Sequence, residues 1–198
     1  MFTISEPTDQ RVRSLLAEQQ ALDFSYPEAG ETRGEPPRRY TVLHHRVCLG
    51  QGAAIYARAV EAVRRWRMFE VAGIRLCWPA APIETGSAVA VVVRHFGFWS
   101  LNCCRIVYTV DEPGPVRRYG FAYGTLPEHA ARGEERFTVE WHASDDTVWY
   151  DVLSFSRPAS MAVSAVHPVA LRLQKRFARR SLDAMVRAAA LAGGPGDD

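Results

Sequence analysis

Five strand-like segments follow one another between residues 87 and 156, and this succession constrains the fold more than any other feature. They are SAVAVVVRHF, WSLNCCRIVYTV, RRYGFAYGT, ERFTVEWHA and TVWYDVLSFS. Their β-branched and aromatic residues are typical of strands, and short turn-forming segments such as DEPGPV and ASDD separate them. Because strands with such short connections pair antiparallel to their neighbours, the segment predicts an antiparallel meander.

One further strand and two helices complete the predicted fold. Residues 40–50 (YTVLHHRVCLG) are predicted to form a strand, and residues 52–69 a helix with Ile55, Ala59 and Val63 on one face. A last amphipathic helix is expected from about 168 to 191, with arginines along one side. These elements predict an α+β fold, in which a curved antiparallel sheet is wrapped around a long C-terminal helix.

The first 39 residues are expected to lie outside this unit. Residues 9–22 are a candidate for a short amphipathic helix, an appendage to the core. Residues 25–39 combine proline, glycine and charge, which is typical of a linker or exposed loop. We therefore predict an N-terminal helix and flexible linker (1–39), a single domain (40–191) and a disordered tail (192–198).

Composition argues against several classes of function. A formal charge of +2 is too small to indicate a nucleic-acid partner. The four cysteines lack CxxC spacing and suitably placed histidines, so no metal site is expected. The N-terminus is polar and no run approaches the length of a membrane span, so we expect a cytoplasmic protein without integral membrane contact. The oligomeric state stays open.

Four stretches carry a family resemblance, namely HFGFWSLNCCRIVYTVDE, YGFAYGTLPEHAARGEERF, VWYDVLSFSRP and RLQKRFARRSL. Through them the region from Tyr40 to Met185 resembles the family called domain of unknown function 1990. The resemblance implies the helix-grip fold, also called START-like or Bet v 1-like, in which a curved sheet grips a long C-terminal helix over a cavity. It carries an expectation about the fold and none about a particular activity.

Common catalytic motifs do not match. LGQGAAI places Gly50 and Gly52 before a helix, but Ile55 occupies the third position of a dinucleotide-binding fingerprint. GxSxG, HExxH and P-loop motifs are absent from the sequence. We therefore expect no cofactor.

The strand RRYGFAYGT has one bulky and one bare face. By strand alternation Tyr119, Phe121 and Tyr123 point one way, while Gly120, Ala122 and Gly124 point the other. A bare strip beneath a helix indicates either close packing of helix on sheet or an open ligand cavity. Both interpretations stay open.

Titratable groups gather in the loop after this strand. It holds His129, Glu134 and Glu135, and the next strand presents Glu140 and His142 on one face. A carboxylate near an imidazole suits proton transfer, because it tunes the histidine towards neutral pH. The alternatives are ligand recognition, or a structural role in which the glutamates cap backbone N–H groups or pair with neighbouring arginines.

Polar residues also interrupt the central apolar strands, and a buried charge needs a partner, as Arg105 and Asp151 would provide for each other. On the concave side of the sheet such residues would orient a ligand in an aromatic-walled cavity, and on the convex side they would be solvated. The candidate ligand-binding residues are Asn102, Arg105, Tyr108, Tyr119, Phe121, Tyr123, Trp141, Trp149 and Arg157.

Three functional hypotheses result. The first, which favours binding over catalysis, is a protein that encloses a small hydrophobic or aromatic molecule between the sheet and the C-terminal helix. The second is an enzyme resembling polyketide cyclases or hydrolases, with His129 and Glu134 as acid and base. The third is an interaction module that uses the basic face of the last helix, an idea that would need exposed aromatic residues beside that face.

Overall fold

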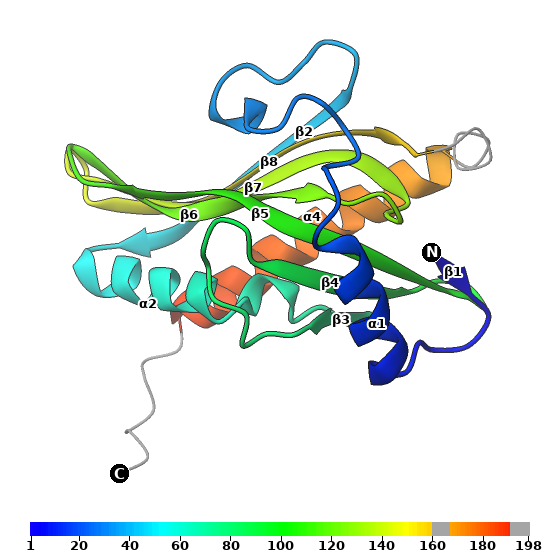
Figure 1. Cartoon of the computed structure of the whole chain (residues 1–198). Helices are drawn as coiled ribbons and strands as arrows, with labels where there is room; N and C mark the ends of the chain where they lie inside the picture. Colours follow the sequence, from blue (N-terminus) through cyan, green and yellow to red (C-terminus); the bar gives the residue numbers. More distant parts are fainter. Residues whose placement is uncertain (160–166, 191–198) are drawn as a thin grey trace.

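The computed structural model describes residues 1–159 and 167–190, and a single antiparallel sheet organises them (Figure 1). Neighbouring strands follow the order β2 (Thr41–Gln51), β8 (Thr147–Pro158), β7 (Ala131–His142), β6 (Val116–Thr125), β5 (Trp99–Glu112), β4 (Ala88–Arg94) and β3 (Ile74–Cys77), and β1 (Phe2–Thr3) pairs with β5. The predicted meander corresponds to β4 through β8 and is confirmed. The short strands β1 and β3 were not predicted, because two and four residues are too few to show a period.

Two helices lie along the concave side of the sheet, as Figure 1 shows. They are α2 (Ala53–Arg64) and α4 (His167–Ala190), and the short helix η2 (Arg67–Phe69) follows α2. Residues at helical spacing on α4, such as Ala178, Met185 and Ala189, are buried against the sheet. The curved antiparallel sheet that holds a long C-terminal helix is therefore confirmed, and it is the helix-grip, START-like arrangement.

The N-terminal helix α1 (Asp9–Gln19) packs on the convex side, over the end of the sheet that contains β4 and β5. Its Val12 and Leu15 are buried in a cluster with Val92, Leu101 and Cys103. The helix is therefore an integral layer of the fold and not the expected appendage. Burial of these apolar side chains supplies the stabilisation that its short length alone would not.

The segment after α1 crosses the convex face towards β7 and β8, in contrast to the exposed linker expected for residues 25–39. Tyr26 is 3% exposed and Thr32, within the short helix η1 (Glu31–Arg33), is fully buried. We call residues 21–40 the strap. Its polar backbone groups find partners on the sheet, which the proline and glycine content could not reveal.

The strap also explains the bare strip of β6. A Cβ atom at Gly124 would collide with the Tyr26 hydroxyl and lie 2.9 Å from the Phe24 ring. At Gly124 the strip therefore faces the strap on the convex side, whereas at Gly120 a Cβ atom would collide with the Phe137 carbonyl of the neighbouring strand β7. Neither of the two expectations, helix packing or a cavity, holds for these glycines. Tyr119, Phe121 and Tyr123 point to the concave side, as alternation predicted.

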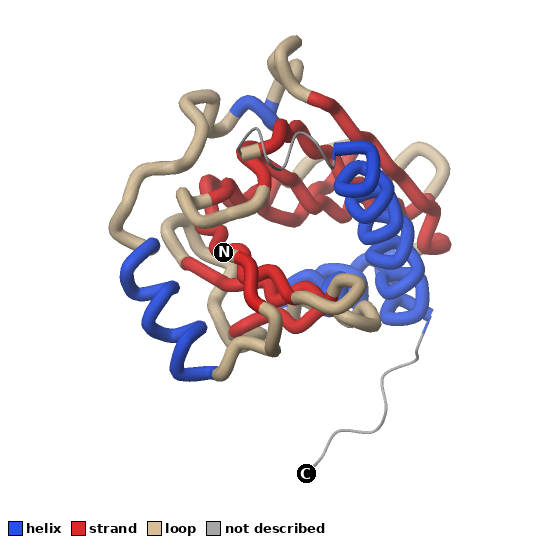
Figure 2. Tube along the Cα trace, turned by 90° about the vertical axis from the view of Figure 1, so that its right-hand side faces the viewer, coloured by secondary structure: helices blue, strands red, loops and turns tan. Residues whose placement is uncertain are grey.

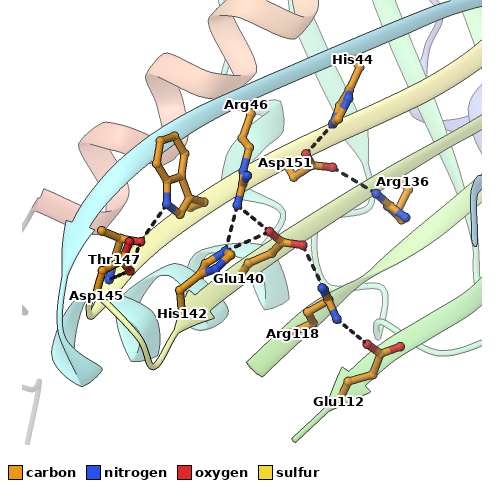
Figure 3. A network of polar contacts seen from close by, with 11 residues as sticks. His44, Arg46, Glu112, Arg118, Arg136, Glu140, His142, Asp145, Thr147 and Asp151 are labelled. Atoms are coloured by element: carbon orange, nitrogen blue, oxygen red, sulfur yellow. Dashed lines mark hydrogen bonds and ion pairs between the residues drawn. The ribbon is translucent and has the colours of Figure 1, made fainter. Parts of the chain in front are cut away.

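Charged residues on the rest of the convex face form a paired network (Figure 3). Asp151 accepts hydrogen bonds from His44 Nε2 at 2.6 Å and from Arg136 at 3.2 Å, so it does not form the predicted pair with Arg105. Glu140 pairs with Arg46 and Arg118. Burial opposes ionisation of Glu140, but these arginines hold its pKa below the usual value.

The predicted tail, residues 192–198, lies outside the described residues. Within the described ranges, none of the helices combines the length and the apolar character needed to cross a bilayer.

Candidate functional site

A cavity of about 620 Å³ lies between the concave face of the sheet and the first half of α4. Every strand of the sheet contributes to its walls, together with η2 and with residues from Leu173 to Arg180 of α4. Figure 2 looks along the molecule with the N-terminus in front and α4 at the right. The volume is within the range of pockets that enclose small organic molecules.

The cavity occupies one half of the concave face because large side chains fill the other half. Trp66 packs on Phe121 with ring centroids 4.7 Å apart, and Phe69 packs on Phe137 at 5.8 Å. Towards β4 and the ends of β7 and β8, the inward positions carry small or medium residues. They include Val91, Val93, Ser100, Gly133 and Ser154. These shorter side chains do not reach α4, so the space remains open.

Glu135 and Tyr123 form a hydrogen-bonded pair on the wall of the cavity. They lie directly opposite each other on β7 and β6, and the tyrosine hydroxyl donates to Glu135 Oε2 at 2.9 Å. Burial raises the pKa of Glu135 to about 7, although the tyrosine hydrogen bond acts in the opposite direction. A carboxyl group with this pKa both accepts and donates hydrogen bonds near neutral pH.

Three histidines line the same cavity, and burial lowers the pKa of each. His45 comes from β2, His95 follows β4 and His129 follows β6. Burial lowers the pKa of His129 to about 4, and it lowers the pKa of His45, with a smaller effect from Arg179, and that of His95. The cavity therefore presents neutral imidazoles at physiological pH.

Two of these imidazoles leave a buried nitrogen without a hydrogen-bond partner in the described part of the chain. The atoms are His45 Nε2 and His95 Nδ1. Buried polar atoms in native proteins are nearly always paired with protein, water or a ligand. Unpaired nitrogens on residues that line a cavity are groups that a bound molecule can satisfy.

Asn102 is the centre of a short polar chain on β5. Its amide nitrogen donates to the Ser100 hydroxyl at 2.9 Å, and that hydroxyl contacts His95 Nε2 at 2.8 Å. Its amide oxygen accepts from the Ala130 backbone at 3.3 Å. The chain fixes the orientation of His95 at the cavity wall.

The structure places only part of the predicted ligand-binding set around this cavity. Asn102, Tyr123 and Arg157 line it. Three others, Tyr119, Phe121 and Trp141, lie on the concave side but pack into the filled half with α2 and its neighbours.

Three members of the set lie on the convex face. Arg105 donates to the backbone carbonyls of Gln20 and Leu22, at 2.7 and 2.9 Å. Tyr108 bonds to Thr32 of the strap at 2.8 Å, and Trp149 stacks under Arg46. None of the three borders the cavity.

The two residues expected to act as acid and base, His129 and Glu134, both border the cavity, but their side chains form hydrogen bonds with other parts of the protein. Glu134 accepts hydrogen bonds from the Tyr26 hydroxyl at 2.8 Å, from the backbone of Gly30 at 2.7 Å and from Thr32. His129 Nδ1 accepts from the Ala131 backbone at 2.9 Å. Glu134 thus has the capping role that was its structural alternative, with the strap as the segment that is capped.

Residues 25–184 match the family model described as Domain of unknown function (DUF1990). The chain belongs to this family. A curated relative called UPF0548 protein, from Deinococcus radiodurans, is 38% identical over 96% of this chain and 99% of its own length. Another UPF0548 protein, from Arabidopsis thaliana, is 32% identical over 75% of this chain and 73% of its own.

The fold is also found among solved structures. The crystal structure of a hypothetical protein from Helicobacter pylori matches with a TM-score of 0.52, covering 78% of this chain and 95% of that one. At 11% sequence identity the likeness concerns the fold alone.

Sequence reasoning missed Glu135, His45 and His95 as cavity residues. The sequence places Glu135 beside Glu134 and does not by itself distinguish their roles. Strand alternation contained one usable signal, because two adjacent glutamates on a strand must point to opposite faces. The two histidines gave no such signal, since their burial depends on α4 and on the turn after β4.

Proposed function

We propose that this member of the DUF1990 family binds a small hydrophobic or aromatic molecule in the cavity between the sheet and α4. The observation that carries the proposal is a largely apolar cavity that holds a few neutral polar groups with unpaired atoms. Apolar walls favour an apolar body, and sparse polar groups orient it. The ligand's polar end would meet Glu135 and Tyr123, with His45 and His95 as further partners.

The neutral state of these groups supports a ligand whose polar end is uncharged. A protonated Glu135 donates a hydrogen bond to a carbonyl or hydroxyl oxygen, and each neutral imidazole offers one donor and one acceptor. The causes of the shift in the pKa of Glu135 are burial and the Tyr123 hydrogen bond, and the arginines that line the cavity, such as Arg157 and Arg176, are not among them. Ketones, phenols and alcohols therefore fit better than carboxylates at this depth.

Native mass spectrometry of the protein purified from its own host tests the proposal most directly. A reproducible adduct, released by mild denaturation, would identify the ligand class. In parallel, fluorescence titration with Nile red measures whether the cavity accepts an apolar molecule. Ser154→Phe fills the cavity and should abolish the titration, whereas Ser144→Phe, on an exposed turn, should leave it unchanged. Equal titration of both variants would contradict the proposal.

A second candidate function is acid–base catalysis inside the same cavity, and the Glu135 and Tyr123 pair favours it. Strongly shifted carboxyl groups in cavities are typical of catalytic acids and bases. The residues differ from the predicted pair of His129 and Glu134, because Glu134 is occupied by the strap. Incubation of the released ligand with protein in deuterium oxide would show catalysed incorporation of deuterium, and Glu135→Gln should remove it. Incorporation by both proteins would refute the role.

A further inference from the structure

Exposed apolar side chains gather at the cavity end that includes β1 and the turn between β4 and β5. Phe96 is 86% exposed, Ile4 92% and Phe2 52%. Phe98 is 39% exposed and contacts Phe2, with ring centroids 5.9 Å apart. We call the three phenylalanines the aromatic rim, and Ile4 lies two positions after Phe2. Phe2, Phe96 and Phe98 also line the cavity, so the rim borders its opening.

Arginines flank the aromatic rim. Arg94 lies at the end of β4, and Arg176 and Arg180 on α4 line the same cavity as the phenylalanines. Within residues 1–159 and 167–190, no carboxylate pairs with Arg94 or Arg176, whereas the arginines in the convex network are paired. The basic face of α4 continues beside them with Arg172, Lys175 and Arg179.

We propose that the aromatic rim and its flanking arginines dock on an anionic lipid bilayer. Phe96 and its neighbours would enter the headgroup region, and Arg94, Arg176 and Arg180 would lie at the level of the lipid phosphates. Apolar side chains that protrude from a turn make few contacts with the rest of the protein. Their transfer from water to the membrane interface is therefore favourable in free energy. Basic residues beside them add attraction to anionic lipid.

The combination favours lipid over other acidic partners. The basic face of α4 carries no aromatic residues of its own. For that reason the sequence alone does not favour an interaction surface there. The fold supplies the aromatic residues from two distant places in the chain, β1 and the turn after β4. The highly exposed side chains of Ile4 and Phe96 have no role in a purely electrostatic contact with nucleic acid.

Co-sedimentation with vesicles tests the proposal, and it needs no cavity ligand. The wild-type protein should bind vesicles of equal parts phosphatidylcholine and phosphatidylserine, and bind phosphatidylcholine alone much more weakly. Phe96→Ser should weaken binding about tenfold, and Arg176→Gln about fivefold, from the usual contributions of one interfacial apolar side chain and one basic residue. Because both side chains are exposed, the fold should not change.

Matched controls come from the convex face. Leu22→Ser removes an apolar residue that is 43% exposed, and Arg38→Gln removes an exposed arginine of the strap. Both should bind vesicles as the wild type does. Failure of the wild type to bind mixed vesicles, equal binding to neutral vesicles, or equal effects of Phe96→Ser and Leu22→Ser would each overturn the proposal. Binding to polyuridylate RNA without any binding to vesicles would assign the surface to nucleic acid and overturn it as well.

Discussion

Glu134 and Glu135 are neighbours in β7, yet they lie in opposite environments on the two faces of one sheet. Glu134 is 2% exposed on the convex side, where four hydrogen bonds from the strap surround its carboxylate. Glu135 lines the cavity on the concave side, where its carboxyl group has only the Tyr123 hydroxyl as a hydrogen-bond partner in the part of the chain that the structure describes. The convex side therefore saturates Glu134 with the chain's own segments, whereas the concave side leaves Glu135 with a single partner among the described residues.

This difference indicates a division of roles between the faces. A buried charge with every oxygen satisfied fixes the position of a segment, and its removal leaves several donors unpaired. A buried carboxyl with one partner is tuned by its surroundings and stays available to another molecule. Of these two adjacent glutamates, Glu134 thus serves stability and Glu135 is available for binding. Substitutions at the two positions can test this division of roles.

The largest effect is expected from Glu134→Ala. It leaves the backbone N–H groups of Gly30 and Thr32 and the Tyr26 hydroxyl without an acceptor, so the free energy of unfolding should fall by about 3 kcal/mol. Urea denaturation measures this, and limited proteolysis should show cleavage within the strap. Glu135→Ala is the matched control and should cost far less. Equal losses for the two variants would contradict the division of roles.

An intermediate effect is expected from Glu135→Gln, and it depends on pH. The folded protein holds the Glu135 proton up to a pKa of about 7, whereas the unfolded chain releases it near 4.5. Between these values the folded state binds more protons, so stability falls as pH rises through this window and is level above it. The wild type should therefore lose about 2 kcal/mol relative to Glu135→Gln between about pH 5 and about pH 8.

Urea denaturation of both proteins at the two pH values checks this prediction. The histidines of the cavity titrate in the same range but with the opposite sign, because a lowered pKa in the folded state reduces stability as pH falls. They are common to both proteins, so the difference between wild type and Glu135→Gln isolates the carboxyl group. A difference that does not change with pH would show that Glu135 is ionised in the folded protein.

Much of the fold could be predicted from the sequence, because it depends on local periods. The meander follows from the alternating pattern of the strands and from the short turns. Strand geometry also predicts that Tyr119, Phe121 and Tyr123 share one face of the sheet. The alternation of side chains does not predict which face of the sheet the helices cover. That choice depends on contacts between β-strands and α4, which lie far apart in the chain.

The candidate site was predicted less well, for two physical reasons. A register shift in β5 between Ile106 and Tyr108 places Arg105 and Tyr108 on the same convex face, although alternation would put them on opposite faces. The strap is held by Glu134, whose partner Gly30 is 104 positions away. Neither an irregular pairing nor a contact of this separation leaves a periodic signal in the sequence.

The smallest effect is expected from Arg105→Leu, although the sequence suggested that Arg105 orients the ligand. Its guanidinium group holds the carbonyls of Gln20 and Leu22 and covers the Phe24 ring, all on the convex side. The variant should lose about 1 kcal/mol of stability, as expected for partly exposed hydrogen bonds, and keep its affinity for Nile red within about twofold. Parallel urea and fluorescence titrations distinguish the two effects. Marked loss of Nile red binding in a stable variant would mean that the two faces are coupled through the sheet, and that the convex side takes part in binding.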